Sequence, residues 1–176
     1  MDVFSVHSSG AIRSRSVISD VPADLELASL TGSARPISEW TTTFHLAIVA
    51  LDPFTIESAW ILGTARRVLS RYQEADVRCA FLVTGTADEA RQFLGPLARE
   101  FLVFADPDRV AVKALGCTTL PAFVHLNQHH QVEAIAEGWT PADWKAVAAN
   151  LSDRMDWTTT VIPDVGDPRP FAGSPV

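Results

Sequence analysis

The chain is poor in cysteine: it has only Cys79 and Cys117 among 176 residues. The two do not form a C-x-x-C pair, so the sequence predicts neither a disulfide framework nor a zinc site. Cys79 lies between apolar neighbours in a predicted strand and is expected to be a core residue. A disulfide between the two is not expected, because a mid-strand thiol should be buried and the compartment reducing.

Long apolar runs are also missing. No run approaches the ~20 residues that a helix needs to cross a bilayer. The N-terminal stretch MDVFSVHSSGAIRSRS lacks the apolar core of a signal peptide. The sequence therefore predicts a protein that does not insert into membranes and is cytoplasmic.

Basic residues are outnumbered: 14 Lys and Arg stand against 21 Asp and Glu, a net charge of −7. Without a concentrated basic patch, nucleic acid is disfavoured as a partner. Apolar residues make up 47% of the chain, which argues against global disorder, and the length suits one domain with tails. His129 and His130 are expected in a solvated turn rather than at a metal, and His45 is expected to be buried.

Several segments carry clear secondary-structure signals. Apolar runs at 44–51 and 77–83 predict buried strands, and 101–104 predicts a short strand, with helical patterns between them. Thr86 and Glu89 have the spacing of a capping box, so a helix should follow and reach about residue 99, with Pro96 disturbing it.

The second half predicts a short helix, a hairpin and a final helix. Asp106-Pro107 should begin the short helix, which ends at Gly116. Residues 122–126 and 132–136 predict an antiparallel hairpin, and Thr140-Pro141 begins the last helix. The order β-α-β-α-β-α-β-β-α predicts a layered α/β domain.

Two tails flank this domain, which is assigned to residues 37–154. Residues 1–36 are Ser-rich and predict a weakly structured extension, with one short element at about 24–30. Residues 155–176 are rich in Pro and Gly and should be extended. The aromatic residues Trp157 and Phe171 are expected to dock this tail on the domain or on a partner.

This order, together with GCTTLPAFVHLNQHHQVEAIAEGWTPADW, resembles the thioredoxin-like superfamily. The segment TGTADEARQFLGPLAREFLVFADPDRVAVKALG is more similar to the peroxiredoxin and thiol-disulfide reductase branch than to thioredoxin itself. The resemblance covers about residues 43–151. It implies a thioredoxin-like α/β fold, with a central mixed sheet flanked by helices and extended N- and C-terminal tails.

The resemblance gives Pro121 a specific meaning. Pro121 stands in TTLPAF, where the family keeps a cis-proline, and in the family the residue before it, here Leu120, pairs its backbone with an extended bound peptide. The alternative is an ordinary trans proline at the start of a strand. Its position favours the cis form.

The family's redox pair lies between a strand and a helix, and the matching stretch here is VALDPFTIESAW. Aligning the two puts Thr55 and Ser58 at the cysteine positions, and a peroxidatic P-x-x-x-T-x-x-C is absent too. A thiol at a helix N-terminus has a lowered pKa, whereas a hydroxyl there stays protonated and exchanges no disulfides. Thr55 and Ser58 either bond a partner or simply cap the helix, and the sequence favours capping.

The sequence therefore predicts a non-catalytic thioredoxin-like protein that binds a protein or peptide partner in a chaperone, assembly or scaffold role. No cofactor and no metal are expected. The predicted groove consists of Asp52, Thr55, Ser58, Thr119, Leu120 and Pro121. Two alternatives stay open: a thiol oxidoreductase or peroxidase-like enzyme that uses Cys117, and a structural subunit that docks by its C-terminal tail. Homo-oligomer formation also stays open.

Overall fold

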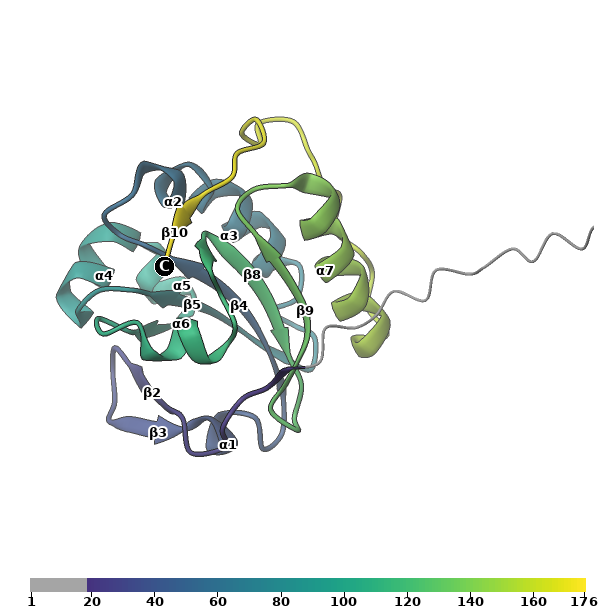
Figure 1. The fold of residues 1–176 in the computed structure, drawn as a ribbon. Helices are drawn as coiled ribbons and strands as arrows, with labels where there is room; N and C mark the ends of the chain where they lie inside the picture. The colour runs from purple at the N-terminus through teal and green to yellow at the C-terminus, as the bar shows by residue number, and fades with distance from the viewer. Residues whose placement is uncertain (1–18) are drawn as a thin grey trace, which may run out of the picture.

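The computed structural model of the chain describes residues 19–176, and a mixed eight-stranded sheet forms its centre (Figure 1). Its strand order is β1-β9-β8-β4-β5-β6-β2-β3, and a separate two-stranded sheet pairs β10 with β7. The elements are β1 (Ser19–Asp20), β2 (Glu26–Ser29), β3 (Ala34–Pro36), α1 (Ile37–Trp40), β4 (His45–Leu51), α2 (Ile56–Trp60), α3 (Leu62–Ser70), β5 (Val77–Val83), α4 (Ala87–Leu94), α5 (Leu97–Glu100), β6 (Leu102–Ala105), α6 (Val110–Ala114), β7 (Thr119–Leu120), β8 (Ala122–Leu126), β9 (Gln131–Glu137), α7 (Pro141–Met155) and β10 (Ser174–Pro175).

Strand β4 lies at the middle of the sheet, parallel to β5 and antiparallel to β8. Its side chains alternate between two cores. Ala47, Val49 and Leu51 join a cluster with α3, α4 and α7, while Leu46, Ile48 and Ala50 join a cluster with α1 and α6. Because both faces are covered, the strand needs apolar residues at every position, as its continuous apolar run predicts.

The predicted helix signals are largely confirmed. Thr86 and Glu89 form the capping box: the Glu89 backbone N–H donates to Thr86 Oγ1 at 3.2 Å, and the Thr86 N–H donates to Glu89 Oε1 at 3.0 Å. Pro96 separates α4 from α5. Helix α6 begins later than predicted, at Val110, although the Asp106 carboxylate still accepts hydrogen bonds from the first turn of the helix.

The short element predicted at about residues 24–30 is β2, but the rest of the prediction for residues 19–36 is corrected. They are not weakly structured: β1 pairs with β9 at one edge of the sheet, and β2 pairs with β6 towards the other. Val21, Leu25 and Leu27 are buried there. Strands of two to four residues are too short to show a period-two pattern. Residues 1–18 of the predicted extension lie outside the described part of the chain.

At the end of the sheet where β4 begins, the buried His125 and the half-buried His45 form a chain of hydrogen bonds. His45 Nδ1 lies 2.9 Å from His125 Nε2, and His125 Nδ1 lies 2.5 Å from Asn150 Oδ1 of α7. Glu133 lies 3.7 Å from His125 and is paired with Arg154 at 2.9 Å. Burial lowers the pKa of both His125 and His45, and the Glu133 carboxylate opposes this in part.

This pair should make the fold sensitive to acid. The pKa of each histidine is lower in the folded chain than its usual ~6.5, so below about pH 6.5 the unfolded chain binds more protons and stability falls. The loss is at most about 1.4 kcal/mol per pH unit for each histidine. Urea unfolding at about pH 7.5 and about pH 5.5 measures it. Equal stability at both pH values would contradict this origin.

Candidate functional site

The turn between β4 and α2 brings together three predicted site residues. Thr55 Oγ1 donates to the Asp52 carbonyl at 3.3 Å and to Ser58 Oγ at 3.2 Å, and the Asp52 N–H donates to Ser58 Oγ at 2.9 Å. Thr55 occupies the N-cap position of α2 but makes no capping hydrogen bond, so simple capping is not its role. The two hydroxyls instead stabilise the turn by hydrogen bonds within it, to each other and to the backbone of Asp52.

The Asp52 carboxylate holds this turn against α6. Its Oδ2 accepts from Arg109 at 3.0 Å and its Oδ1 accepts from the Phe54 N–H at 2.9 Å. The Asp52 side chain is only 6% exposed, so its charge is paired where water is scarce. Sequence reasoning missed Arg109, which has a left-handed backbone with φ of 60°. The only local signal was its place in a DPDR turn.

The second part of the site lies around Pro121. The Leu120–Pro121 bond is cis, and Leu120 is buried. Ala50, near the end of β4, pairs with Ala122 at the start of the antiparallel strand β8. Asp52, which follows β4, and Pro121, which precedes β8, therefore lie at the same edge of the sheet. The Gly138 N–H donates to the Pro121 carbonyl at 2.7 Å. The backbone of Thr118–Pro121, with Gly138 and Trp139, is named the Pro121 edge below.

This edge is already occupied by the chain's own C-terminus. Strand β10 pairs antiparallel with β7, with Ser174 opposite Leu120 and Pro175 opposite Thr119. The Val176 N–H donates to the Thr118 carbonyl at 3.0 Å. Figure 1 shows this segment in yellow, running from the end of α7 to β10 near α2. The expected docking of the tail is therefore confirmed for its last residues.

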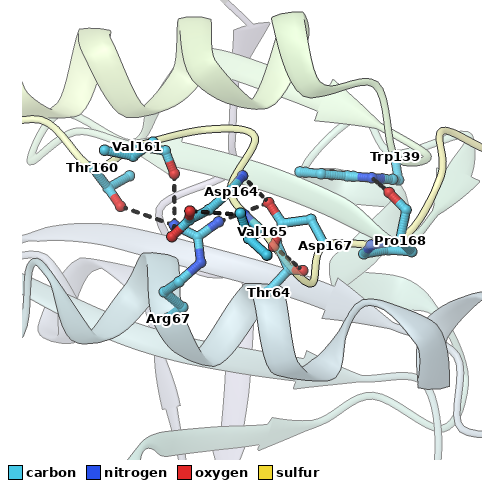
Figure 2. A network of polar contacts seen from close by, with 9 residues as sticks. All are labelled: Thr64, Arg67, Trp139, Thr160, Val161, Asp164, Val165, Asp167 and Pro168. Carbon is cyan, nitrogen blue, oxygen red and sulfur yellow. Dashed lines mark hydrogen bonds and ion pairs between the residues drawn. The ribbon is translucent and has the colours of Figure 1, made fainter.

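Asp167 of the tail, four residues before Phe171, forms an ion pair with Arg67 of α3 (Figure 2). Arg67 donates to Asp167 Oδ2 at 2.8 Å, and Thr64 Oγ1 donates to Asp167 Oδ1 at 2.8 Å. Arg67 also donates to the Val161 carbonyl at 2.6 Å. The Asp167 side chain is only 5% exposed. These contacts of Thr64, Arg67 and Asp167 are called the latch.

Exposed apolar side chains surround the turn. Phe54 is 69% exposed and Ile56 is 61% exposed. Trp60, at the end of α2, packs its ring on Phe171 of the tail with centroids 5.6 Å apart. Large apolar side chains that stay in water at one turn are typical of a surface that contacts another chain. The signal was present in the sequence as three large apolar residues in PFTIESAW.

Cys117 is a buried thiol in this structure. Its side chain is buried beside the Pro121 edge, and burial, with the carboxylates of Glu137 and Asp106, raises its pKa to about 12. Burial also raises the pKa of Cys79 to about 12. A thiol of that pKa is about 10⁻⁵ ionised at pH 7, and the thiolate is the nucleophile.

Both cysteines should therefore resist a thiol reagent in the folded protein. With 5,5′-dithiobis(2-nitrobenzoate) at neutral pH, we expect native protein to react at least about a thousandfold more slowly than free cysteine. In urea both thiols should react at the normal rate. A native thiol that reacts as fast as free cysteine would contradict the burial of Cys117 or Cys79.

Metal and membrane sites receive no support in the described range. Within residues 19–176, no three side chains of His, Cys, Asp or Glu are grouped so that they could hold a metal ion. No helix in that range is long and apolar enough to cross a bilayer.

Comparisons with known proteins identify the fold. No protein family model and no curated protein sequence matches the chain. Among solved structures, a cysteine-to-serine mutant of Xanthomonas campestris peroxiredoxin Q is 16% identical, with a TM-score of 0.63 over 77% of this chain and 96% of that one. A secreted Mycobacterium tuberculosis disulfide oxidoreductase homologous to E. coli DsbE is 13% identical, with a TM-score of 0.54 over 67% and 86%.

A third solved structure, a hypothetical protein from Sinorhizobium meliloti 1021, is 15% identical and has a TM-score of 0.60 over 84% of this chain and 91% of that chain. Identities this low show shared architecture and leave function open. The similarity of these structures shows that the chain has the thioredoxin-like fold.

Proposed function

We propose that this protein binds an extended segment of a protein partner at the Pro121 edge, without thiol chemistry, in a chaperone, assembly or scaffold role. The observation that carries the proposal is the pairing of β7 with an extended strand, β10. A backbone edge that pairs with one extended segment can pair with another of the same shape once the first has left. The exposed side chains of Phe54 and Ile56 provide apolar contact area beside it.

The hydroxyls at the turn support a role without catalysis. Thr55 and Ser58 are hydrogen-bonded to each other and to Asp52, and none of their contacts is with a base that could activate them as nucleophiles. The alternative, a thiol oxidoreductase or peroxidase-like enzyme that uses Cys117, fits the fold of the solved neighbours equally well. Its weakness is the burial of the sulfur.

Turnover assays separate these two functions. We expect no reduction of insulin disulfides and no consumption of peroxide above the rate without protein, for wild type and for Cys117→Ser alike. Turnover by wild type that disappears in Cys117→Ser would establish the enzyme. The cytoplasmic location and a homo-oligomer stay predictions, as does a subunit that docks on a partner by its C-terminal tail.

Photo-crosslinking in the native source tests the binding role. A photoreactive phenylalanine analogue at Phe54 should give discrete adducts with one or a few proteins. The same analogue at Val161 is a matched control, since Val161 is 67% exposed against 69% for Phe54 but lies on the tail near the latch. Adducts that are the same at both positions, or absent at Phe54, would count against the proposed function.

A further inference from the structure

The last six residues fit the Pro121 edge like a bound ligand. Phe171 and Trp139 exchange two backbone hydrogen bonds, of 2.8 Å and 3.0 Å. The Phe171 ring packs on Trp60, and Val176 reaches the second core cluster. The tail therefore contacts the edge through its backbone and through one aromatic anchor.

A pair of glycines allows the backbones to approach this closely. Gly173 has φ of +84°, and an added Cβ would lie 2.5 Å from the Leu120 carbonyl oxygen and 2.9 Å from Thr119 Cγ2. Gly138 faces it with φ of +67°, and a Cβ there would collide with the Ala172 carbonyl. Because moving the backbone of the edge would cost free energy, the edge accepts only glycine at the position of Gly173.

Building on the proposed function, we infer that the segment Phe171–Val176 is an intramolecular ligand of the Pro121 edge and that it marks the class of partner segment. That class is an extended polypeptide that carries an aromatic residue two positions before a glycine and pairs antiparallel with β7. The tail and the partner compete for the same backbone groups of Thr118–Leu120. The protein is therefore closed until its tail leaves the edge.

Tethering makes the tail a strong competitor. A segment linked to its site by a short chain acts at an effective concentration in the millimolar range. A free peptide of the same sequence at micromolar concentration should bind the wild-type chain poorly. A change that unseats the tail should reveal the intrinsic affinity, because the observed affinity is reduced by the fraction of molecules that are open.

The test measures binding of a fluorescein-labelled peptide, PRPFAGSPV, which copies residues 168–176, by anisotropy. The full-length Gly173→Val chain should bind it at least about tenfold more tightly than wild type does, because the valine displaces the chain's own tail. Ala172→Val is the matched control, since Ala172 is exposed and the same side chain adds no clash there. A peptide with valine in place of glycine should bind at least about tenfold more weakly to the opened chain.

A second variant guards against misfolding of the first. Arg67→Ala removes the latch at a distance from the Pro121 edge and should also tighten binding of the labelled peptide. If neither variant binds the peptide more tightly than wild type, or if the valine peptide binds as well, the inference is overturned. If crosslinking at Phe54 gives adducts but no variant binds the labelled peptide, this inference is wrong and the proposed function stands. If the peptide binds but crosslinking at Phe54 gives no adducts, the proposed function is wrong and this inference stands.

Discussion

Replacing Trp144 with alanine should lower the free energy of unfolding by about 3–5 kcal/mol. Trp144 is fully buried in α7, with its ring 5.1 Å from Phe123 and 5.3 Å from Trp139 between centroids. Its Nε1 donates to the Gly138 carbonyl at 2.8 Å. Alanine would leave a cavity in a dense core and a carbonyl without its donor, and both effects act in the same direction.

Trp157→Ala is the matched control for this variant. Trp157 is 36% exposed, and its Nε1 also donates to a backbone carbonyl, that of Arg71, at 2.7 Å. Losing one hydrogen bond and a partly buried ring should cost about 1–2 kcal/mol, less than the loss of the fully buried Trp144. Urea unfolding at neutral pH compares the two. A Trp144→Ala loss no larger than that of Trp157→Ala would show that α7 contributes little to the stability of the sheet.

The parts of the fold that could be predicted are those with local signals. The strands β4 and β5 appear as continuous apolar runs because both of their faces are buried, and the capping box before α4 requires only two residues three positions apart. The hairpin of β8 and β9 and the start of α7 at Pro141 follow from turn residues in the same way. In each case the residues that determine the element are neighbours in sequence.

The parts that were missed depend on distant partners. Strand β1 has two residues, and only its pairing with β9 makes it a strand. Arg109 and Asp52 are 57 positions apart, and Arg67 and Asp167 are 100 apart, so no local pattern joins them. The fold brings the two charges of such an ion pair together, so the pair can be predicted only once the fold is known.

The candidate site likewise has residues that the sequence could place and contacts that it could not. Thr55, Ser58 and Pro121 could be placed only through the resemblance, because nothing in their own chemistry marks them. That the chain's own tail pairs with β7 could not be predicted, because a Pro- and Gly-rich segment has no period from which its register could be read.

Arg67→Ala should release the tail while the central sheet stays folded. Without Arg67, the buried Asp167 carboxylate keeps hydrogen bonds from Thr64 and from the Asp164 N–H but loses its counter-charge. Leaving such a charge buried is costly, and the chain avoids the cost by detaching the segment. Because Arg67 is partly exposed, we expect a loss of about 2–3 kcal/mol, which corresponds to roughly a hundredfold change in the opening equilibrium.

Amide hydrogen exchange measures this release. The N–H groups of Asp164, Phe171 and Val176 are hydrogen-bonded within the tail or to the Pro121 edge and should exchange about a hundredfold faster in Arg67→Ala, while amides of β4 and β5 keep their protection. Arg66→Ala is the control, since Arg66 makes only an exposed ion pair with Glu100.

The pattern among these three amides separates two ways of holding the tail. If the latch holds the segment as one unit, all three amides accelerate together, since β10 has only two residues and is too short to stay paired alone. If only the Asp164 amide accelerates, the glycine contacts at Gly173 and the Phe171 anchor hold β10 independently. Unchanged exchange at all three would mean that the ion pair between Arg67 and Asp167 does not keep the tail in place.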